Sequence, residues 1–410
     1  MEYILERTTH SQKGPANAQS SQAAKLLRAL ACLASLMLVA ATSLAQTYSV
    51  IHDFNPASDG SEPTGNLLED SAGNWYGTFD YGEAATAFGG VYQIDPAGTV
   101  TVLAGFGSGS IAGYPRSGLF RDTDGTLYGV TYGGGDTTCQ CGTVYKLDTS
   151  GNVTILHKFL GGADGAFPIT QLISIDGVLY GTTGYNGVDS VFGVLFKITK
   201  GGEYTVVHQF LQNSPEGNIP NDLTRDAAGN IYGSTQFDGG SSGTDKGTIF
   251  KLDTSGTLTV LYAFTGGTDG GQPMGRLIID VNGNIHGTTI GGGNATCKCG
   301  VVFRLDAAGN EHVLHTFNTL RDGQFPNTGV IDAGGTLYGA TGSGGFTNCT
   351  GGCGVIYKIS NTGVYSVLQR FNITDGKNPS RVALGSDGNL YGTTSFGGTN
   401  GAGVFFKILP

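Results

Sequence analysis

Leu179-Tyr180-Gly181-Thr182 is one of seven related copies of a short motif that recurs along this chain of 410 residues. From the glycine of one copy to the glycine of the next, the steps are 52, 52, 52, 54, 52 and 53 residues. A fixed period of roughly 50 residues is typical of propellers and solenoids. The motif glycines are Gly77, Gly129, Gly181, Gly233, Gly287, Gly339 and Gly392.

The third repeat shows how each unit is organised. Runs of β-branched and aromatic residues cover 154–159, 172–175, 178–183 and 193–198. Glycine, proline and aspartate separate these runs, and such residues mark tight turns. In most units the turn reads Asp-x-x-Gly, a spacing that favours short hairpins. Each repeat is therefore predicted to form four short antiparallel strands.

Seven such units predict an all-β fold, a seven-bladed β-propeller of four-stranded antiparallel blades. Tyr48 to Phe54 matches the fourth strand of a unit, whereas Val404 to Ile408 matches the third. We expect the N-terminal strand to join the last blade and close the ring, which leaves only short edges. The glycine within each motif strand predicts the close approach of another backbone.

The first 45 residues are predicted to be a secretory signal peptide. Lys25 and Arg28 precede a small-to-apolar run from Ala29 to Ala41, and Ser43-Leu44-Ala45 supplies a cleavage site. The run is shorter than the roughly 18 residues that a spanning helix needs, so no membrane span is expected after cleavage. The rest of the chain, 46–410, is expected to form a single domain of seven repeats.

The charge balance is acidic. The whole chain carries a net charge of −10, and removal of the leader takes away four basic and two acidic residues, leaving −12. Nucleic acids and anionic membranes bind basic surfaces, so neither is expected as a partner. Glycine accounts for 71 residues, and within a fixed period this abundance indicates tight turns and close packing. We expect a monomer.

The repeated sequence resembles a known family. The phrase Asp-x-x-Gly-Asn-Leu-Tyr-Gly-Thr-Thr, a Gly-Gly loop, and the strands Gly-Thr-Val-Phe-Lys-Leu-Asp and Thr-Val-Leu-x-x-Phe are similar to the bacterial secreted repeats called GloVer, found in choice-of-anchor extracellular proteins. The likeness covers 47–410, and a looser one extends to NHL and kelch propellers. It implies secretion and a repeat scaffold, and it assigns no catalytic residues. No C-terminal sorting segment is expected here.

Six cysteines beyond the leader form three pairs in the same loop of their repeats. An even number of cysteines in a secreted chain predicts disulfides. Four thiolates from the second and third pairs would also suffice for zinc, but the first pair has no neighbouring pair, so local bridges are favoured. A bridge between the fifth and sixth repeats stays open. The pairs are Cys139 with Cys141, Cys297 with Cys299, and Cys349 with Cys353. No metal and no cofactor are predicted.

The loop after the outer-strand phenylalanine carries an acid before glycine in six of seven repeats. These acids could form a carboxylate ring that holds hard cations or sugar hydroxyls, but we favour a turn with solvated carboxylates. The acidic loop ring consists of Asp59, Asp164, Glu216, Asp269, Asp322 and Asp375. Histidines two residues before the same phenylalanine are expected to be packing or surface residues. They are His52, His157, His208 and His315.

The position just before the first strand of each unit differs from repeat to repeat. A residue type present in every blade serves the blade, whereas a residue present in one blade needs another reason. If the first strand is innermost, the polar members of this set would form an asymmetric rim at the channel mouth, where propellers hold ligands. The set is Asn66, Gly118, Gln171, Asp222, Arg276, Gly329 and Arg381. Its polar members are the predicted ligand-binding residues.

The sequence contains no catalytic motif in a convincing context. We therefore expect a secreted, non-enzymatic propeller that binds an extracellular glycan or a surface protein. The alternative is a secreted lyase or glycoside hydrolase with its site at the channel mouth, supported only by analogy of fold. A purely structural surface component is a third interpretation.

Overall fold

The computed structural model describes residues 47–82, 87–107, 112–184, 191–239, 246–346 and 349–410. The predicted signal peptide, residues 1–45, lies outside this range. Tyr48 to Pro410 form one compact unit. Within the described residues, no helix combines the length and the hydropathy needed to cross a bilayer.

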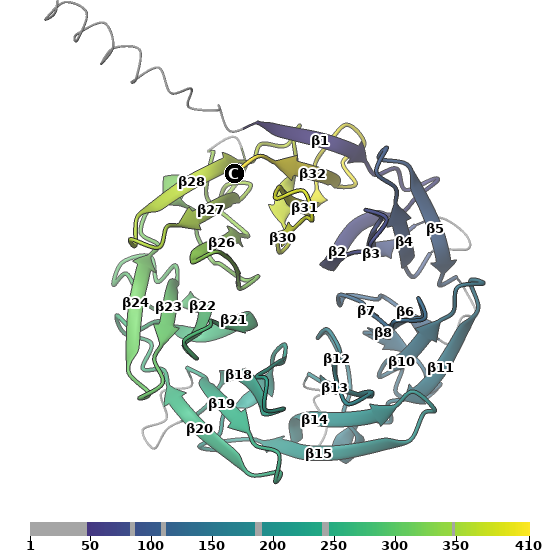
Figure 1. Cartoon of the computed structure of the whole chain (residues 1–410), viewed down its shortest axis with the longest axis horizontal. Coiled ribbons are helices and arrows are strands. Elements are labelled where there is room, and N and C mark those ends of the chain that lie inside the picture. The colour runs from purple at the N-terminus through teal and green to yellow at the C-terminus, as the bar shows by residue number, and fades with distance from the viewer. Residues whose placement is uncertain (1–46, 83–86, 108–111, 185–190, 240–245, 347–348) are drawn as a thin grey trace, which may run out of the picture. The chain divides into compact units, whose positions relative to one another are not determined.

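This unit is all-β, and its strands form seven four-stranded antiparallel blades in a ring, which confirms the predicted propeller (Figure 1). Blade 1 contains β2 (Ser61–Glu69), β3 (Trp75–Tyr81), β4 (Gly90–Ile94) and β5 (Val100–Gly105). Blade 2 contains β7 (Phe120–Arg121), β8 (Leu127–Thr131), β10 (Thr143–Leu147) and β11 (Val153–Lys158). Blade 3 contains β12 (Ile173–Ile175), β13 (Val178–Thr182), β14 (Val191–Thr199) and β15 (Tyr204–Leu211).

The remaining blades follow the same order, although the innermost strand is interrupted in blades 4 and 7. Blade 4 contains β16 (Asn218–Pro220), β17 (Thr224–Arg225), β18 (Ile231–Phe237), β19 (Thr248–Leu252) and β20 (Leu258–Ala263). Blade 5 contains β21 (Gly271–Ile279), β22 (Ile285–Gly291), β23 (Val301–Leu305) and β24 (Glu311–Thr316). Blade 6 contains β25 (Val330–Ala333), β26 (Thr336–Thr341), β27 (Val355–Ile359) and β28 (Tyr365–Arg370). Blade 7 contains β29 (Lys377–Pro379), β30 (Ala383–Leu384), β31 (Leu390–Phe396), β32 (Val404–Ile408) and β1 (Tyr48–Asp53).

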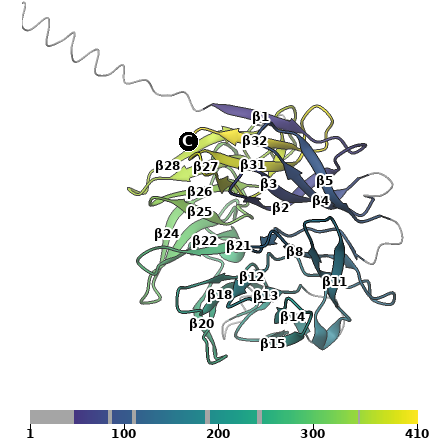
Figure 2. The same cartoon turned by 45° about the vertical axis from the view of Figure 1, so that its right-hand side comes forward.

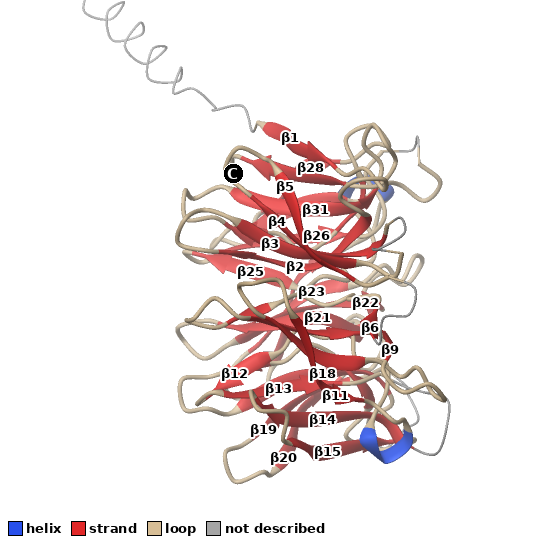
Figure 3. Ribbon diagram, turned by 90° about the vertical axis from the view of Figure 1, so that its right-hand side faces the viewer, coloured by secondary structure: helices blue, strands red, loops and turns tan. Residues whose placement is uncertain are grey.

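Short elements lie in the connections. β6 (Ala112–Gly113) pairs with β9 (Gly133–Gly134). The 3-10 turns η2 (Gly162–Asp164) and η3 (Leu320–Asp322) lie in the loops that enter blades 3 and 6. Figure 3 shows both turns on the same side of the ring, and we call this side the acid-loop face.

The first strand of each blade lines the centre and the fourth forms the outer wall, as the views in Figures 1 and 2 show. The N-terminal strand closes the ring as predicted. β1 pairs antiparallel with β32, and Tyr48 lies opposite Ile408 while Asp53 lies opposite Val404. The chain ends are therefore joined through backbone hydrogen bonds of a single sheet.

The Asp-x-x-Gly turns form as their sequence predicts. In blade 4, the Asp226 carboxylate accepts hydrogen bonds from the backbone N–H groups of Ala228 and Asn230, both at 2.9 Å. The N–H of Gly229 donates to the Asp226 carbonyl, and the glycine has φ 87°. Only glycine adopts this conformation without strain, which explains the fixed spacing.

The motif glycine has a different partner from the one predicted. A Cβ on Gly77 would lie 2.3 Å from the hydroxyl of Tyr92, and a Cβ on Gly181 would lie 2.6 Å from the ring of Phe196. The neighbour is thus an aromatic ring of the third strand, directly across the sheet, and not a backbone. The glycine is needed because the tip of the ring occupies the space that a Cβ would fill. The rings are Tyr92, Tyr145, Phe196, Phe250, Phe303, Tyr357 and Phe406.

Neighbouring blades are joined by aromatic pairs between their buried cores. The phenylalanine at the end of each outer strand contacts the third-strand ring of the next blade, with ring centroids 5.2 to 5.4 Å apart. All seven phenylalanines are at most 1% exposed. Such pairs favour tilted or edge-to-face geometry and stabilise by roughly 0.5–1.5 kcal/mol beyond area burial. These seven aromatic contacts hold neighbouring blades at a fixed spacing. The position of any binding site formed by two or more blades depends on that spacing.

Candidate functional site

Two of the predicted channel residues lie inside an innermost strand, whereas Gln171 precedes β12 as predicted. Asn66 and Arg276 sit at bulges of β2 and β21, where the pairing skips from Thr64 to Leu68 and from Met274 to Ile278. Asp222 and Arg381 occupy the interruptions of the innermost strands in blades 4 and 7. A bulge takes a residue out of the ladder and redirects its side chain. The repeat position that we singled out therefore includes two bulge positions, Asn66 and Arg276.

Hydrogen bonds join four of these residues across blades 1, 3, 4 and 5. Asn66 Nδ2 donates to Gln171 Oε1 at 3.0 Å, and Arg276 Nη1 donates to the same oxygen at 3.3 Å. The Gln171 backbone N–H donates to Asp222 Oδ1 at 2.7 Å. Arg381 lies apart from this chain of bonds and donates to the Val330 carbonyl at 2.9 Å.

The charges of the channel do not balance. Burial raises the pKa of Asp222, although the Gln171 N–H and the two arginines oppose this shift. Burial also lowers the pKa of Arg276, and burial together with the like charge of Arg276 lowers the pKa of Arg381 to about 10. Two guanidinium groups thus face one carboxylate, so the channel is locally positive inside an acidic protein.

The two glycines in this set have a packing role. A Cβ on Gly118 would lie 2.9 Å from the Asn66 Cβ, and a Cβ on Gly329 would lie 2.5 Å from the Arg276 carbonyl oxygen. The innermost strands of neighbouring blades touch at these two points. Polar side chains are consequently confined to the other five positions, which gives the cluster its asymmetry.

The carboxylates of the acidic loop ring contact other groups of the protein itself. Asp164 Oδ2 lies 3.1 Å from His157 Nε2 and accepts a hydrogen bond from the Leu160 backbone at 2.8 Å. The other acids make the equivalent contact: Asp59 with His52, Glu216 with His208, Asp269 with Tyr262, Asp322 with His315, and Asp375 with Gln369. The carboxylates are therefore neither a free cation ring nor simply solvated, and the histidines are their partners.

The junction of blades 1 and 2 supports this pairing, because both the acid and the histidine are absent there. The loop that enters blade 2 has Ala112 in place of the acid, and the outer strand of blade 1, β5, has Ala104 in place of the histidine. Both members of the pair are thus replaced together. His286, which interrupts the series of motif tyrosines, is likewise a structural exchange, because its Nε2 lies 3.1 Å from Asp280 where Tyr232 contacts Asp226 at the same distance.

The cysteines form three local disulfides, as favoured from the sequence, and no bridge joins the fifth and sixth repeats. The Cα atoms of the bridged pairs are 5.1, 5.2 and 5.5 Å apart for Cys139–Cys141, Cys297–Cys299 and Cys349–Cys353. The single residue between the first two pairs adopts a left-handed conformation, with φ 51° at Gln140 and 50° at Lys298. This turn brings the two halves of each short bridge together.

The sequence missed a row of aromatic side chains on the acid-loop face of blades 1 to 3. Tyr81 and Tyr114 have ring centroids 5.6 Å apart, and the Arg116 guanidinium lies 5.9 Å from the Tyr114 centroid and 4.8 Å from the Tyr132 centroid. Tyr132 in turn stacks on Phe167 at 4.9 Å. We call these five side chains the aromatic row.

A buried carboxylate holds the cation of this row in place. Arg116 Nε donates to Asp80 Oδ2 at 2.8 Å, and Asp80 is only 4% exposed. Burial raises the pKa of Asp80, and the nearby Arg116 opposes that shift. The second oxygen, Asp80 Oδ1, is buried without a hydrogen-bond partner among the described residues. The arginine is therefore fixed between two rings.

Comparison with known proteins identifies the repeat. The family model of the Gloeobacter/Verrucomicrobia repeat matches residues 38–244 and 219–410. The chain belongs to this family. No curated protein matches the sequence.

Solved structures share the fold at low sequence identity. The extracellular domain of the putative hybrid two-component system BT4673 from B. thetaiotaomicron is 13% identical, with a TM-score of 0.53 over 89% of this chain and 42% of that one. The gluconolactonase XC5397 from Xanthomonas campestris is 11% identical, with a TM-score of 0.44 over 89% and 90%. This chain spans less than half of the first structure's length. The likeness to the first structure shows the fold alone.

The Gloeobacter/Verrucomicrobia repeat also explains how the row could have been found. Tyr132 occupies the position after the motif-strand threonine, where other blades carry Gly184, Gln236 or Ser395. Arg116 occupies the position after the loop proline, which no other repeat fills with a charged residue. Both residues are therefore peculiar to one blade and can be recognised by comparing the repeats.

Proposed function

We propose that this chain is a secreted, non-enzymatic propeller that binds an extracellular glycan through the aromatic row. One observation carries the proposal: an ordered line of partly exposed rings, interrupted by a fixed arginine, on one face of a rigid ring. Sugar rings present apolar C–H faces and polar edges. Tyrosine rings supply apolar area with a hydrogen-bonding tip, and arginine supplies several donors in a fixed fork. The three disulfides support export to an oxidising compartment.

The enzymatic alternative places chemistry in the channel. Glycoside hydrolysis usually requires two carboxyl groups at a set separation, and the five predicted channel residues include only one, Asp222. Its oxygen already accepts a hydrogen bond from Gln171. These features favour binding over turnover, although a lyase or hydrolase remains the alternative to be tested.

The test is a glycan array probed with the secreted protein, followed by titration of the best ligand. Tyr132→Ala is expected to weaken binding about tenfold, because losing one aromatic contact costs roughly 1–1.5 kcal/mol. Gln236→Ala, at the same repeat position in blade 4, is the matched control and should leave the affinity unchanged. Equal affinity of the Tyr132 variant and the parent would reject the row as the binding surface.

The same titration separates binding from catalysis. The bound glycan is incubated with the protein and assayed for new reducing ends and for unsaturated products. We expect none. Product release that disappears in Asp222→Asn would replace the binding module with the channel enzyme.

A further inference from the structure

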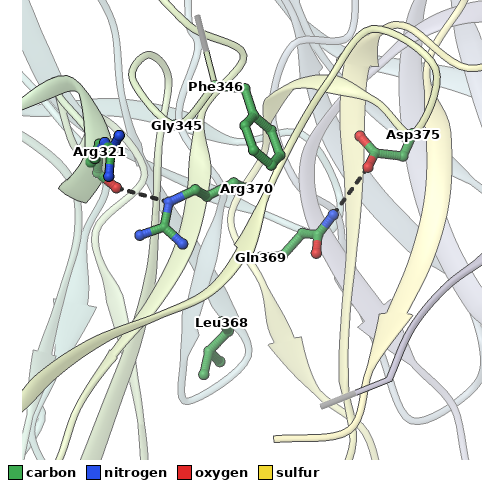
Figure 4. A pocket seen from close by; sticks show the side chains of 7 residues that line it. All are labelled: Arg321, Gly345, Phe346, Leu368, Gln369, Arg370 and Asp375. Carbon is green, nitrogen blue, oxygen red and sulfur yellow. Dashed lines mark hydrogen bonds between the residues drawn. The ribbon is translucent and has the colours of Figure 1, made fainter. Parts of the chain in front are cut away.

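A pocket lies on the same acid-loop face as the aromatic row, but over blade 6 and the loop into blade 7. It encloses about 670 Å³, within the roughly 300–1,000 Å³ of small-ligand sites. Figure 4 shows Phe346, Gln369 and Arg370 around its centre, with Arg321 beside them and Asp375 across from them. The pocket thus combines an aromatic ring, two cations and two polar groups.

The two arginines of this pocket are not neutralised inside the protein. Arg370 Nε donates to the Arg321 carbonyl oxygen at 3.1 Å, which fixes the Arg370 side chain and leaves its terminal nitrogens free (Figure 4). Among the described residues, neither guanidinium forms an ion pair. Two unpaired arginines side by side repel each other. A bound anion would relieve this repulsion, so the two arginines favour an anionic ligand in the pocket.

The lining is also peculiar to one blade. At the position of Arg370, before the outer phenylalanine, the other repeats carry Asp53, Gly105, Lys158, Gln209, Ala263 and Thr316. At the position of Arg321, the described repeats carry Ser58, Ala163, Pro215, Thr268 and Thr374. Phe346 follows a Gly-Gly pair after which other repeats carry Asp136, Asn294 or Thr399. The blade fold therefore requires none of these three residues, yet they converge.

The chemistry of the lining limits the ligand. Phe346 is 49% exposed and offers a flat apolar face. Gln369 Nε2 donates to Asp375 Oδ2 at 3.1 Å, so one polar pair on the far side is already oriented to meet hydroxyl groups. Arg321 and Arg370 together with Asp375 give a net charge of one positive unit. This charge matches a monoanion such as a carboxylate, whereas the negative charge of a phosphate monoester dianion would exceed it.

We propose that this pocket binds one hexuronate residue of an acidic polysaccharide. The uronate carboxylate lies on Arg370 and Arg321, since a guanidinium fork suits a carboxylate bidentately. The sugar ring packs on Phe346, and its hydroxyls face Gln369 and Asp375. The site is separate from the aromatic row and shares with the proposed function only the assumption that the ligand is a glycan.

The test is calorimetric titration of the full-length secreted protein with a trimeric oligouronate. Arg370→Gln is expected to weaken binding at least tenfold, and Arg370→Lys to give an intermediate loss because it keeps the charge without the fork. Lys158→Gln is the matched control, at the same repeat position in blade 2, and should bind like the parent. Raising the salt concentration should weaken binding of the parent more than that of Arg370→Gln.

Two further arms decide the outcome. Tyr132→Ala should leave trimer binding unchanged. The proposal for the aromatic row and the proposal for this pocket can therefore be rejected independently. Melting curves must show that each variant folds. The proposal is overturned by absence of parent binding up to about 10 mM trimer, a range that covers weak millimolar affinities. It is overturned as well by unchanged affinity in Arg370→Gln and Arg321→Gln, or by binding of a sulfated trisaccharide in place of the uronate.

Discussion

At the scale of the residue, three tyrosine hydroxyls are buried over the motif glycines. Tyr92, Tyr145 and Tyr357 are fully buried, and their hydroxyl oxygens have no hydrogen-bond partner among the described residues. Burial strongly raises the pKa of all three. The other four blades place phenylalanine at this site. A buried hydroxyl without a partner keeps its desolvation cost, so the tyrosines are a local defect in the repeat.

Tyr92→Phe is therefore expected to stabilise the protein by about 1 kcal/mol, because it removes an unsatisfied buried group and keeps the ring. Tyr76→Phe, one strand away, should destabilise by a similar amount, since the Tyr76 hydroxyl donates to Asp70 at 3.0 Å. Denaturant unfolding of both variants gives the two free energies. A loss of stability in Tyr92→Phe would mean that its hydroxyl has a partner, such as a bound water.

At the scale of the element, contacts of a glycine and a proline hold each pair of neighbouring blades together. We call these contacts the latch. In six of the seven repeats the loop reads acid, glycine, two residues, then proline, and in the second it reads Ala112-Gly113-Tyr114-Pro115. The residue before proline has φ between 52° and 57° in all seven. Its N–H donates to the preceding blade, as Phe325 does to the Cys299 carbonyl at 3.0 Å. The proline packs on the glycine that opens the third strand, as Pro326 does on Gly300.

Gly300→Ala is expected to destabilise the protein by more than about 3 kcal/mol, through strain and overpacking together. At Gly300, φ is 91°, and a Cβ would lie 1.9 Å from the Thr289 carbonyl oxygen and 3.0 Å from Pro326. Gly283→Ala is the control, because φ is 80° there and nothing lies within 4 Å of the added carbon. It should lose only about 1 kcal/mol, from backbone strain alone. Equal losses in thermal unfolding would contradict the latch.

The sequence predicted the strands and their order more completely than it predicted the contacts between their side chains. Periodicity and turn residues located the strands, the blade number and the closing strand, because each depends on local pattern. The acid-to-histidine contact was missed because the two residues lie seven apart, as in His157 and Asp164, around a turn that no pattern describes. Asp80, Arg116 and Tyr132 come together only after blades 1 and 2 pack. The spacing of these three residues along the sequence does not predict that contact.

At the scale of the whole molecule, the ring depends on the strand that joins its two ends. β1 carries no covalent link to β32, yet it supplies the outer wall of blade 7. It also contacts the loop between blades 6 and 7, where the Tyr48 hydroxyl donates to the Asp375 carbonyl oxygen. Asp53 accepts a hydrogen bond from the Thr399 backbone at 2.9 Å. Without β1, the edge of β32 would be exposed and open to pairing with another chain.

Deletion of residues 48–53 is expected to lower the melting temperature by at least about 10 °C, since a loss of several kcal/mol moves the midpoint by this much in a protein of this size. Appending the same strand after Ile408, through an Asp-x-x-Gly turn copied from 306–309, should restore the parent value, because Tyr48 already lies opposite Ile408. Calorimetry and light scattering of the three proteins test both expectations. If the deletion melts like the parent, the closing strand is dispensable; if the appended strand fails to rescue it, the loss came from the altered N-terminus and not from the open edge.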